Sequence, residues 1–278
     1  MDNISSLNAA KAISRWLIPL AAIFVFVLWV SITPPGLLGK ADAIGYAICH
    51  RIDERSFHIE DRQLPLCARC TGEFLSAGLT ILFLSLFSTK HSGMPGWKIG
   101  IPLILFFLAF GVDGTNSYLY LLKQTSAGAL ENIPNLYVPN NTLRLLTGSG
   151  MGIAIGSILF PAFNQTAWRT SDPRPALDGK KFGILTAFIF SMDILLLTEH
   201  TLILYLFAIF SVLGALTLLI MVFSMAWTLV MGSENTFDSL PQMWMPLLGG
   251  TTAAFLLILL IDLIRFRLTG TWGGFSLG

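Results

Sequence analysis

The sequence predicts an all-α protein, a polytopic membrane helix bundle with about seven transmembrane helices. Three observations support this fold class: 54% of the 278 residues are hydrophobic, only 12% are charged, and the mean hydropathy is +0.71. Soluble domains carry about twice that share of charged residues, so the lipid bilayer is the expected environment. The formal net charge of +1 offers no basic field, and we expect no nucleic-acid partner.

Apolar runs place the expected helices, because a helix needs about 20 residues to cross the hydrocarbon core of a bilayer. The runs lie at residues 16–32, 71–88, 100–122, 143–162, 182–198, 203–232 and 243–266. They are continuously apolar and lack the alternation of membrane β-barrel strands. Pro34, Pro35 and Gly36 follow the first run as a helix stop rather than a cleavage site, so we expect this helix to be retained.

The distribution of polar residues divides the chain into two predicted parts. Residues 1–165 form a membrane domain that carries a Cys/His-rich loop at 33–70, and residues 182–278 form a C-terminal extension of three membrane helices. The fourth predicted helix contains a row of glycines spaced by four residues, which lets a neighbouring helix approach closely. These glycines are Gly148, Gly152 and Gly156.

All three cysteines of the chain lie in the loop or where it joins the second predicted helix, at Cys49, Cys67 and Cys70. A C-x2-C pair suits a tetrahedral metal ion, because two thiolates from one tight turn reach the ion at about 2.3 Å without straining the backbone. A set of three cysteines and one histidine is common in structural zinc sites, and thiolates select zinc or iron over hard cations. We therefore predict a zinc site, with iron as the alternative metal.

The fourth ligand has two candidates. His50 adjoins Cys49, and neighbouring side chains of an extended chain point to opposite sides, so geometry alone favours His58. His50, however, belongs to the family pattern described below. The predicted metal ligands are therefore Cys49, His50, Cys67 and Cys70, with His58 as the possible alternative.

Two other interpretations of the cysteines stay open. Cys67 and Cys70 precede a predicted helix whose N-terminus would lower a thiol pKa, and Arg69 lies between them. This arrangement suits thiol-disulfide chemistry or a reaction linked to a membrane quinone, which is a cofactor under this hypothesis alone. The third interpretation is that reduced cysteines serve only in packing.

Arginines and acidic residues share the same loop, and their usual role is a network of solvated salt bridges. A minority interpretation is that the arginines bind a phosphate or a lipid head group, because guanidinium groups contact phosphate in a bidentate fork. The polar-site candidates from this loop are Arg51, Glu54, Arg55 and Arg69.

Ionisable side chains inside a membrane are costly unless they are paired. Asp113 lies in the third predicted helix and Arg144 begins the fourth. One short loop joins these helices as an antiparallel pair, which permits a buried contact between Asp113 and Arg144, either as a structural bridge or in a polar ligand or proton pocket. Asp262 and Arg265 are three residues apart and are expected to form an ion pair.

At these residues the sequence resembles a family of predicted membrane proteins of bacteria and archaea, a domain of unknown function with the motifs C-H-R-x-x-E-R-S-F and Q-L-P-x-C-A-R-C-T-G. Both motifs are intact here, at residues 49–57 and 63–72. The resemblance extends over roughly residues 45–156, and Asp53, His58 and Glu73 depart from the pattern, which weakens His58 as a ligand. Later family features are Asp113, Gly114, Asn141, Arg144, Leu145, Thr147 and Gly148.

The favoured function is a multi-pass protein of a prokaryotic plasma membrane with an interfacial zinc site that has a structural or accessory role in a larger membrane complex. The chain shows no recognisable nucleophile motif, phosphate loop or cofactor fingerprint that would favour an enzyme of a known class. A redox protein is the first alternative, and a small-solute transporter that depends on Asp113 is the second. The expected partners are the lipid bilayer and, under the favoured hypothesis, other membrane-protein subunits.

Overall fold

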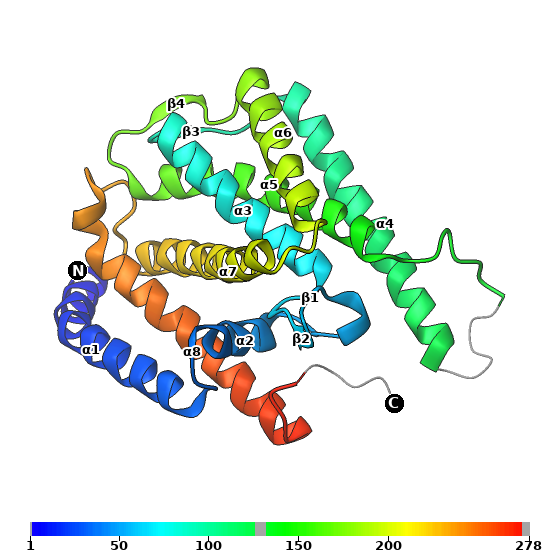
Figure 1. Ribbon diagram of the computed structural model, residues 1–278. Coiled ribbons are helices and arrows are strands. Elements are labelled where there is room, and N and C mark those ends of the chain that lie inside the picture. The colour runs from blue at the N-terminus through cyan, green and yellow to red at the C-terminus, as the bar shows by residue number, and fades with distance from the viewer. Residues whose placement is uncertain (1, 126–131, 274–278) are drawn as a thin grey trace.

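The computed structural model describes residues 2–125 and 132–273, so part of the predicted loop before Asn141 lies outside the described residues. In these ranges the chain is a bundle of α-helices (Figure 1). The helices are α1 (Asp2–Ile32), α2 (Leu37–Ile48), α3 (Ala68–Phe87), α4 (Trp97–Thr125), α5 (Asn141–Ala167), α6 (Gly179–Leu196), α7 (Thr201–Val230) and α8 (Trp244–Thr269). The short elements between them are the 3-10 helices η1 (Asp53–Arg55) and η2 (Leu240–Met243) and the strands β1 (His58–Ile59), β2 (Arg62–Gln63), β3 (His91–Gly93) and β4 (Asp172–Pro175).

The predicted all-α membrane bundle is confirmed, although the number of apolar helices differs from the expected seven. Among the described residues, six helices are long and apolar enough to cross a membrane, namely α1, α3, α4, α5, α7 and α8. The predicted run at 182–198 forms α6, which has 18 residues and carries Lys180, Lys181 and Asp193. These charges exclude α6 from the apolar set, since charged residues oppose insertion into lipid.

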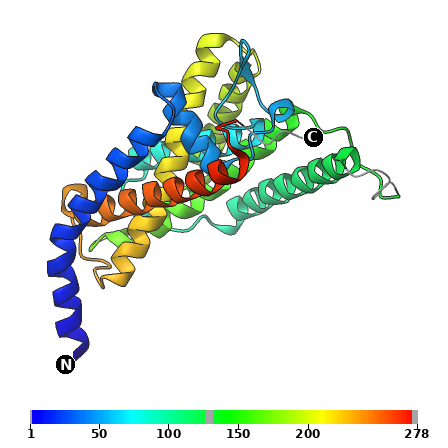
Figure 2. The same ribbon diagram turned by 90° about the horizontal axis from the view of Figure 1, so that it is seen from below.

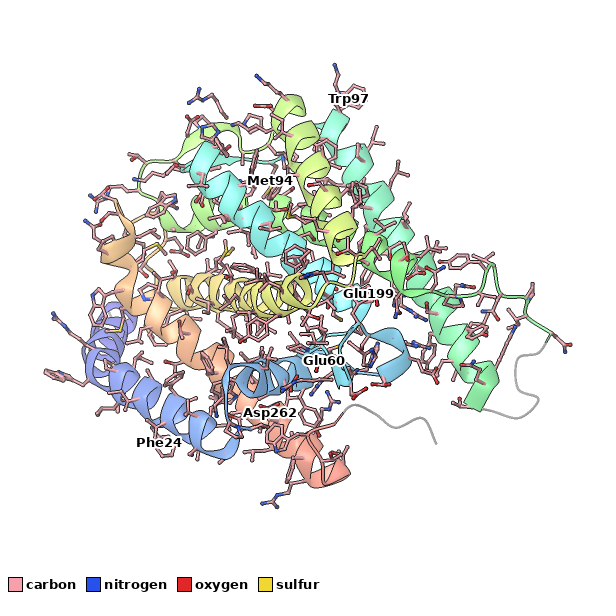
Figure 3. The ribbon with its side chains drawn as sticks, viewed as in Figure 1. Phe24, Glu60, Met94, Trp97, Glu199 and Asp262 are labelled. Carbon is pink, nitrogen blue, oxygen red and sulfur yellow. The ribbon has the colours of Figure 1, made fainter. Side chains whose placement is uncertain are left out.

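The two ends of the bundle show where α6 runs. At one end, which we call the β3–β4 end, β3 pairs in parallel with β4, and α6 begins a few residues later. Figure 3 shows Met94 and Trp97 at this end and Glu60 and Glu199 far from it. At the opposite end, Leu196 at the close of α6 packs in one apolar cluster with Phe57 and Leu64 of the predicted cysteine loop. Helix α6 therefore connects the same two ends as the six apolar helices.

The predicted loop at 33–70 contains more regular structure than we expected, because residues 37–48 form α2. Lys40 of α2 donates hydrogen bonds from Nζ to the carbonyl oxygens of Val30, at 2.5 Å, and Thr33, at 3.0 Å. These bonds satisfy carbonyl groups that the end of α1 leaves without intrahelical partners. The helix is too short to resemble a membrane span, which explains why hydropathy alone did not predict it.

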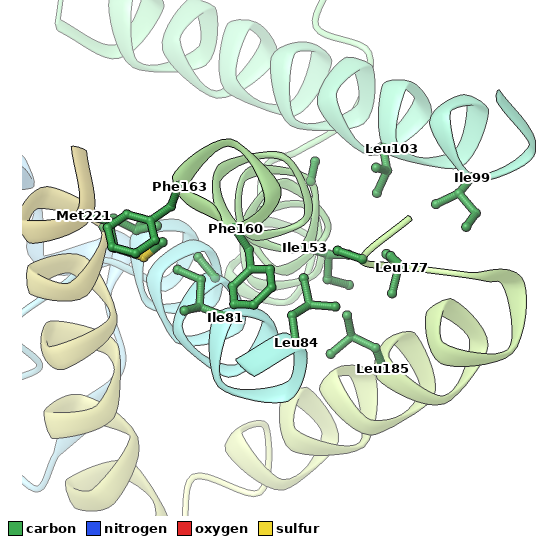
Figure 4. Packing of buried hydrophobic residues seen from close by; sticks show 14 of the residues in the cluster. Ile81, Leu84, Ile99, Leu103, Ile153, Phe160, Phe163, Leu177, Leu185 and Met221 are labelled. Carbon is green, nitrogen blue, oxygen red and sulfur yellow. The ribbon is translucent and has the colours of Figure 1, made fainter. Parts of the chain in front are cut away.

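Helices α3 and α5 form the centre of the bundle, where the glycine row of α5 meets α3. A methyl group at Gly148 would overlap the carbonyl oxygen of Arg69, and one at Gly152 would overlap that of Glu73. The packing role predicted for these glycines is therefore confirmed. Around this contact, apolar side chains of α3, α4, α5, α6 and α7 form the main core, of which Figure 4 shows Ile81, Ile153, Leu103, Leu185 and Met221.

The C-terminal helices pack directly on the first part of the chain. Gly214 of α7 lies against the carbonyl oxygen of Phe74 in α3, and α8 lies beside α1 and α2 (Figure 1). Figure 2 shows α4 running along one side of the bundle, with α1 and α8 on the other. Because Met221 and Met243 share a core with Ile153, the two predicted parts are in continuous contact.

Candidate metal centre and the adjoining arginine cluster

Two helix ends bring the three cysteines together. Cys49 follows the last residue of α2, Cys67 is the N-cap of α3, and Cys70 lies in the first turn of α3. Their Sγ atoms all lie within 4.8 Å of one another, and the side chains of Cys49 and Cys67 are buried. The predicted grouping of these thiols is thus present in the folded chain.

Backbone groups surround the Cys49 sulfur. The amide of Cys67 donates a hydrogen bond to Sγ at 3.3 Å, and the amide of Arg51 donates another at 3.4 Å. The pKa of Cys49 lies well below that of an ordinary thiol, because hydrogen bonds from Cys67 and Cys70 favour the thiolate more than burial disfavours it. Cys49 is therefore the thiol best prepared to act as an anionic ligand.

The spacing of the sulfurs fits a tetrahedral metal ion. Zinc–sulfur bonds of about 2.3 Å place tetrahedral sulfur ligands about 3.8 Å apart. Three sulfurs that all lie within 4.8 Å of one another need only small side-chain movements to reach that distance. The donor set of three thiolates suits zinc or iron. Among the described residues, no histidine nitrogen or carboxylate oxygen lies as close to all three sulfurs.

The two histidine candidates have other partners here. His50 Nδ1 accepts a hydrogen bond from the amide of Ile52 at 3.0 Å, and His58 Nε2 lies 2.9 Å from Oδ1 of Asp53. His58 is held by the β1–β2 hairpin, whereas His50 adjoins a cysteine and reaches the sulfurs only if its ring rotates. Both assignments as fourth ligand stay predictions.

Helix α8 also contributes to the cysteine site, which the sequence analysis did not predict. Arg265 donates hydrogen bonds from one guanidinium nitrogen to the carbonyl oxygens of Tyr46 and Cys49, the latter at 2.7 Å. The guanidinium lies 3.9 Å from the centre of the Tyr46 ring. The Tyr46 hydroxyl in turn contacts Thr269 at 2.8 Å. The end of α8 therefore fixes the end of α2 from which Cys49 projects.

Asp262, the expected partner of Arg265, is fully buried on α8 (Figure 3). Arg265 donates hydrogen bonds to the backbone carbonyls of Tyr46 and Cys49, and its positive charge also acts on the Asp262 carboxylate, its expected partner.

The polar candidates of the loop separate into two groups. Arg51 is buried, and its guanidinium donates to Oδ1 of Asp42 and to the carbonyl oxygen of Trp272, both at 3.0 Å. This pair holds the first turn of the loop against α2. Glu54 is exposed on η1, and its carbonyl oxygen lies 3.5 Å from the side-chain amide of Asn141. Arg55 and Arg69 turn the other way, towards α4.

The second group surrounds Asp113, which is 1% exposed. Asp113 forms an ion pair with Arg69, and it accepts hydrogen bonds from the Tyr137 hydroxyl at 2.7 Å and the Thr147 hydroxyl at 3.3 Å. The expected contact between Asp113 and Arg144 was wrong. The close packing of α3 on α5 brings Arg69 to the carboxylate, while Arg144 donates to Oδ1 of Asn141 in its own helix turn at 2.9 Å.

The sequence analysis did not identify several residues of this second group. Ser117 lies one helical turn after Asp113, and a search along the helix face would have found it. Tyr137 gave no sequence signal, because it lies in an irregular segment far from Asp113 along the chain. Burial and its hydrogen bond to Asp113 raise the pKa of Tyr137 to about 12, so its hydroxyl remains a donor at neutral pH.

These features define a class, a multi-pass helical membrane protein with a cluster of three thiols, two of them buried, at one end of its bundle. The model of a family described as predicted membrane protein (DUF2085) matches residues 49–158. An uncharacterized protein of Methanothermobacter thermautotrophicus is 31% identical over 110 residues, which cover 39% of this chain and 82% of that relative. The chain belongs to this family of predicted membrane proteins. No solved structure matches it.

Proposed function

We propose that Cys49, Cys67 and Cys70 bind a zinc ion that fixes α2 to α3, and that the protein is a structural or accessory element of a larger complex in a prokaryotic plasma membrane. The observation that carries this proposal is the grouping of the three Sγ atoms within 4.8 Å, from two helix ends that are 18 residues apart. Iron is the alternative metal, because it accepts the same thiolate ligands.

The ion supplies a crosslink between chain segments that would otherwise be costly to hold together. A crosslink that closes a loop of about 20 residues lowers the entropy of the unfolded chain, which stabilises the folded state by about 3 kcal/mol. The chain's own groups prepare the site, because the amides of Arg51 and Cys67 stabilise a negative Cys49 sulfur and Arg265 orients the adjoining carbonyl. His50 after a ring rotation, or a water molecule, would complete four ligands.

Metal analysis tests the proposal. Detergent-purified protein, prepared without chelators, is expected to contain about one equivalent of zinc or iron, and Cys67→Ser is expected to lose it. Ser85→Ala, at an exposed site near the other end of α3, serves as the matched control and should retain the ion. A metal content below about half an equivalent in the unaltered protein would reject the proposal.

The same three sulfurs support a redox protein as the second candidate, and a neighbouring cavity supports its quinone-linked form. The cavity has a volume of about 990 Å³, and apolar side chains from α3, α4, α5 and α7 line it. Ile48, the residue before Cys49, is one of its lining residues, so an apolar molecule bound there would lie near the end of α2.

The redox step would be the oxidation of a dithiol to a disulfide. Two thiols, of Cys67 and Cys70, lose two protons and two electrons as the S–S bond forms, and a quinone takes up both to become a quinol. A partner's disulfide would instead become two thiols. Alkylation after mild oxidation distinguishes the two functions: the redox protein loses two thiols together, whereas the zinc protein retains three protected thiols and its metal.

A small-solute transporter remains the third hypothesis. The sequence suggested it because Asp113 is an ionisable residue within a predicted membrane helix. In the structure, the Asp113 carboxylate has three hydrogen-bond or ion-pair partners. Uptake by reconstituted vesicles that is lost in Asp113→Asn, with metal content unchanged, would favour transport over both other functions.

A further inference from the structure

Three guanidinium groups from different elements lie close enough together for their positive charges to interact. Arg55 comes from η1, Arg69 from α3 and Arg144 from α5. Arg55 donates to the carbonyl oxygen of Ser117 at 3.0 Å, and Arg69 donates to the hydroxyl of the same residue at 3.1 Å. Arg55 and Arg144 are only 9% and 7% exposed. Two of the three charges are thus almost completely removed from solvent.

Few of the nearby acids contact these arginines directly. Among the described residues, only Asp113 forms an ion pair with any of the three arginines, and its partner is Arg69. Exposed Glu54 acts on Arg55, and half-buried Glu73, one helical turn after Arg69, acts on Arg69, in both cases without a recorded ion pair. The pKa of Arg55 lies below that of an ordinary arginine, first because of burial and then because of the positive charge of Arg69. A buried guanidinium that lacks a direct acceptor for its donors is costly, so Arg55 and Arg144 favour an anion that contacts them.

Hydrogen-bond donors of the cluster also lack acceptors. The Nε atoms of Arg69 and Arg144 are buried and have no hydrogen-bond partner among the described residues. Arg144 otherwise donates only to Asn141, and Arg55 only to a backbone carbonyl. Guanidinium groups with free donors and a planar fork match the oxygens of a phosphate group. Arg144 lies in the first turn of α5, where the helix dipole also favours an anion.

We propose that Arg55, Arg69 and Arg144 form a binding site for a phosphate-type oxyanion at the cysteine end of the bundle. The oxyanion is the phosphate of an anionic lipid head group or free phosphate, which share the same recognition chemistry. Asp113 neutralises Arg69 in part and fixes its guanidinium, while Arg55 and Arg144 supply the remaining charge. The site does not depend on a metal at the cysteines.

Binding measurements on the whole protein test this site. The protein is placed in nanodiscs of phosphatidylcholine, whose head group has no net charge, and binding of radiolabelled inorganic phosphate is measured by equilibrium dialysis. In a second arm, native mass spectrometry measures retention of phosphatidylglycerol over phosphatidylcholine. Arg144→Gln and Arg55→Gln remove one charge each but keep a polar side chain. Arg174→Gln is the matched control, because Arg174 is exposed at the β3–β4 end.

We expect Arg144→Gln and Arg55→Gln each to weaken binding about tenfold or more, since each loses charged hydrogen bonds. Arg174→Gln is expected to bind as the unaltered protein does. Phosphatidylglycerol retention without phosphate binding assigns a lipid head group, and phosphate binding without lipid retention assigns the free ion.

Binding of neither ligand by the unaltered protein would overturn the proposal. Equal binding by the unaltered protein and by both cluster variants would also overturn it. If Arg144→Gln elutes as aggregate in size-exclusion chromatography, Arg55→Gln decides, because its hydrogen bond to a backbone carbonyl is the smaller structural loss.

Discussion

The backbone amide of Cys67 donates a hydrogen bond to the Sγ atom of Cys49 over 3.3 Å, although the two residues are 18 positions apart in the chain. This bond joins the end of α2 to the start of α3 before any metal is considered. The position of α2 therefore controls the distance between Cys49 and the C-x2-C pair.

Gly45→Ala is expected to disturb the cysteine site from within α2. A methyl group at Gly45 would overlap the carbonyl oxygen of Pro65, two residues before Cys67. Overpacking of this kind costs about 1–3 kcal/mol and would push Cys49 away from Cys67. Metal content and the melting temperature in detergent should both fall. Gly111→Ala, in α4 with open space around it, is the control, and an equal response of both variants would contradict the prediction.

Arg265→Gln is expected to weaken metal retention although it lies outside the matched family segment. The substitution removes charged hydrogen bonds to the carbonyl oxygens of Tyr46 and Cys49, which are worth about 1.5–3 kcal/mol each. Zinc release to a chelating dye should become faster. Arg267→Gln, at an exposed position in the last turn of α8, should release zinc at the original rate. Identical rates in both variants would show that α8 does not support the site.

Asp113→Asn is expected to destabilise the bundle by about 3–5 kcal/mol, because it leaves the guanidinium of Arg69 without its buried counter-charge. Thermal unfolding followed by circular dichroism measures the change. Asp238→Asn removes an exposed ion pair with Arg169 and should leave the melting temperature unchanged. A wild-type melting temperature for Asp113→Asn would mean that another acid neutralises Arg69.

A chelator and the substitution Cys70→Ser are both expected to destabilise the protein by removing the metal–sulfur bonds. A strong chelator should lower the melting temperature of the unaltered protein, and Cys70→Ser should lower it by a similar amount. The chelator should then have no further effect on Cys70→Ser, since the ion is already lost. A Cys70→Ser protein that keeps its full metal load would show that Cys70 is not a ligand.

The membrane orientation follows from which cations remain exposed. The exposed cations of the β3–β4 end are Arg15, Lys98, Arg169, Arg174 and Lys180, whereas those described at the cysteine end are Arg62 and Arg267. The positive-inside rule then places the β3–β4 end in the cytoplasm. A fluorescent protein fused before α1 should therefore fluoresce, and one fused after α8 should not.

The two fusions also test whether α6 crosses the membrane. If α6 crosses, the chain spans the bilayer seven times and the two fusion sites lie on opposite sides. Fluorescence from both fusions would show an even number of crossings, and α6 would then lie on one side. Fluorescence from the second fusion alone would reverse the assigned orientation.

The sequence was sufficient to locate the cysteine site and much of its surroundings. Cys49, Cys67 and Cys70 were identified from their spacing, and the glycine row of α5 predicted its close contact with a neighbouring helix. Both are local patterns, since a C-x2-C turn and a four-residue repeat fix which side chains share one turn or one helix face. The partner of Asp113 was not local, and the sequence favoured Arg144 where the structure has Arg69.

The sequence by itself determined that this protein is a helical membrane protein with its thiols in one segment, because apolar length and residue spacing are properties of the chain alone. Only the tertiary structure decided that α2 is a helix, that Arg265 of α8 supports Cys49, and that Arg55 and Arg69 meet at Ser117. The physical reason is that buried ion pairs and backbone contacts depend on how helices pack against one another. Hydropathy predicts that those helices exist. The close approach of helices at glycines then determines which polar groups come into contact.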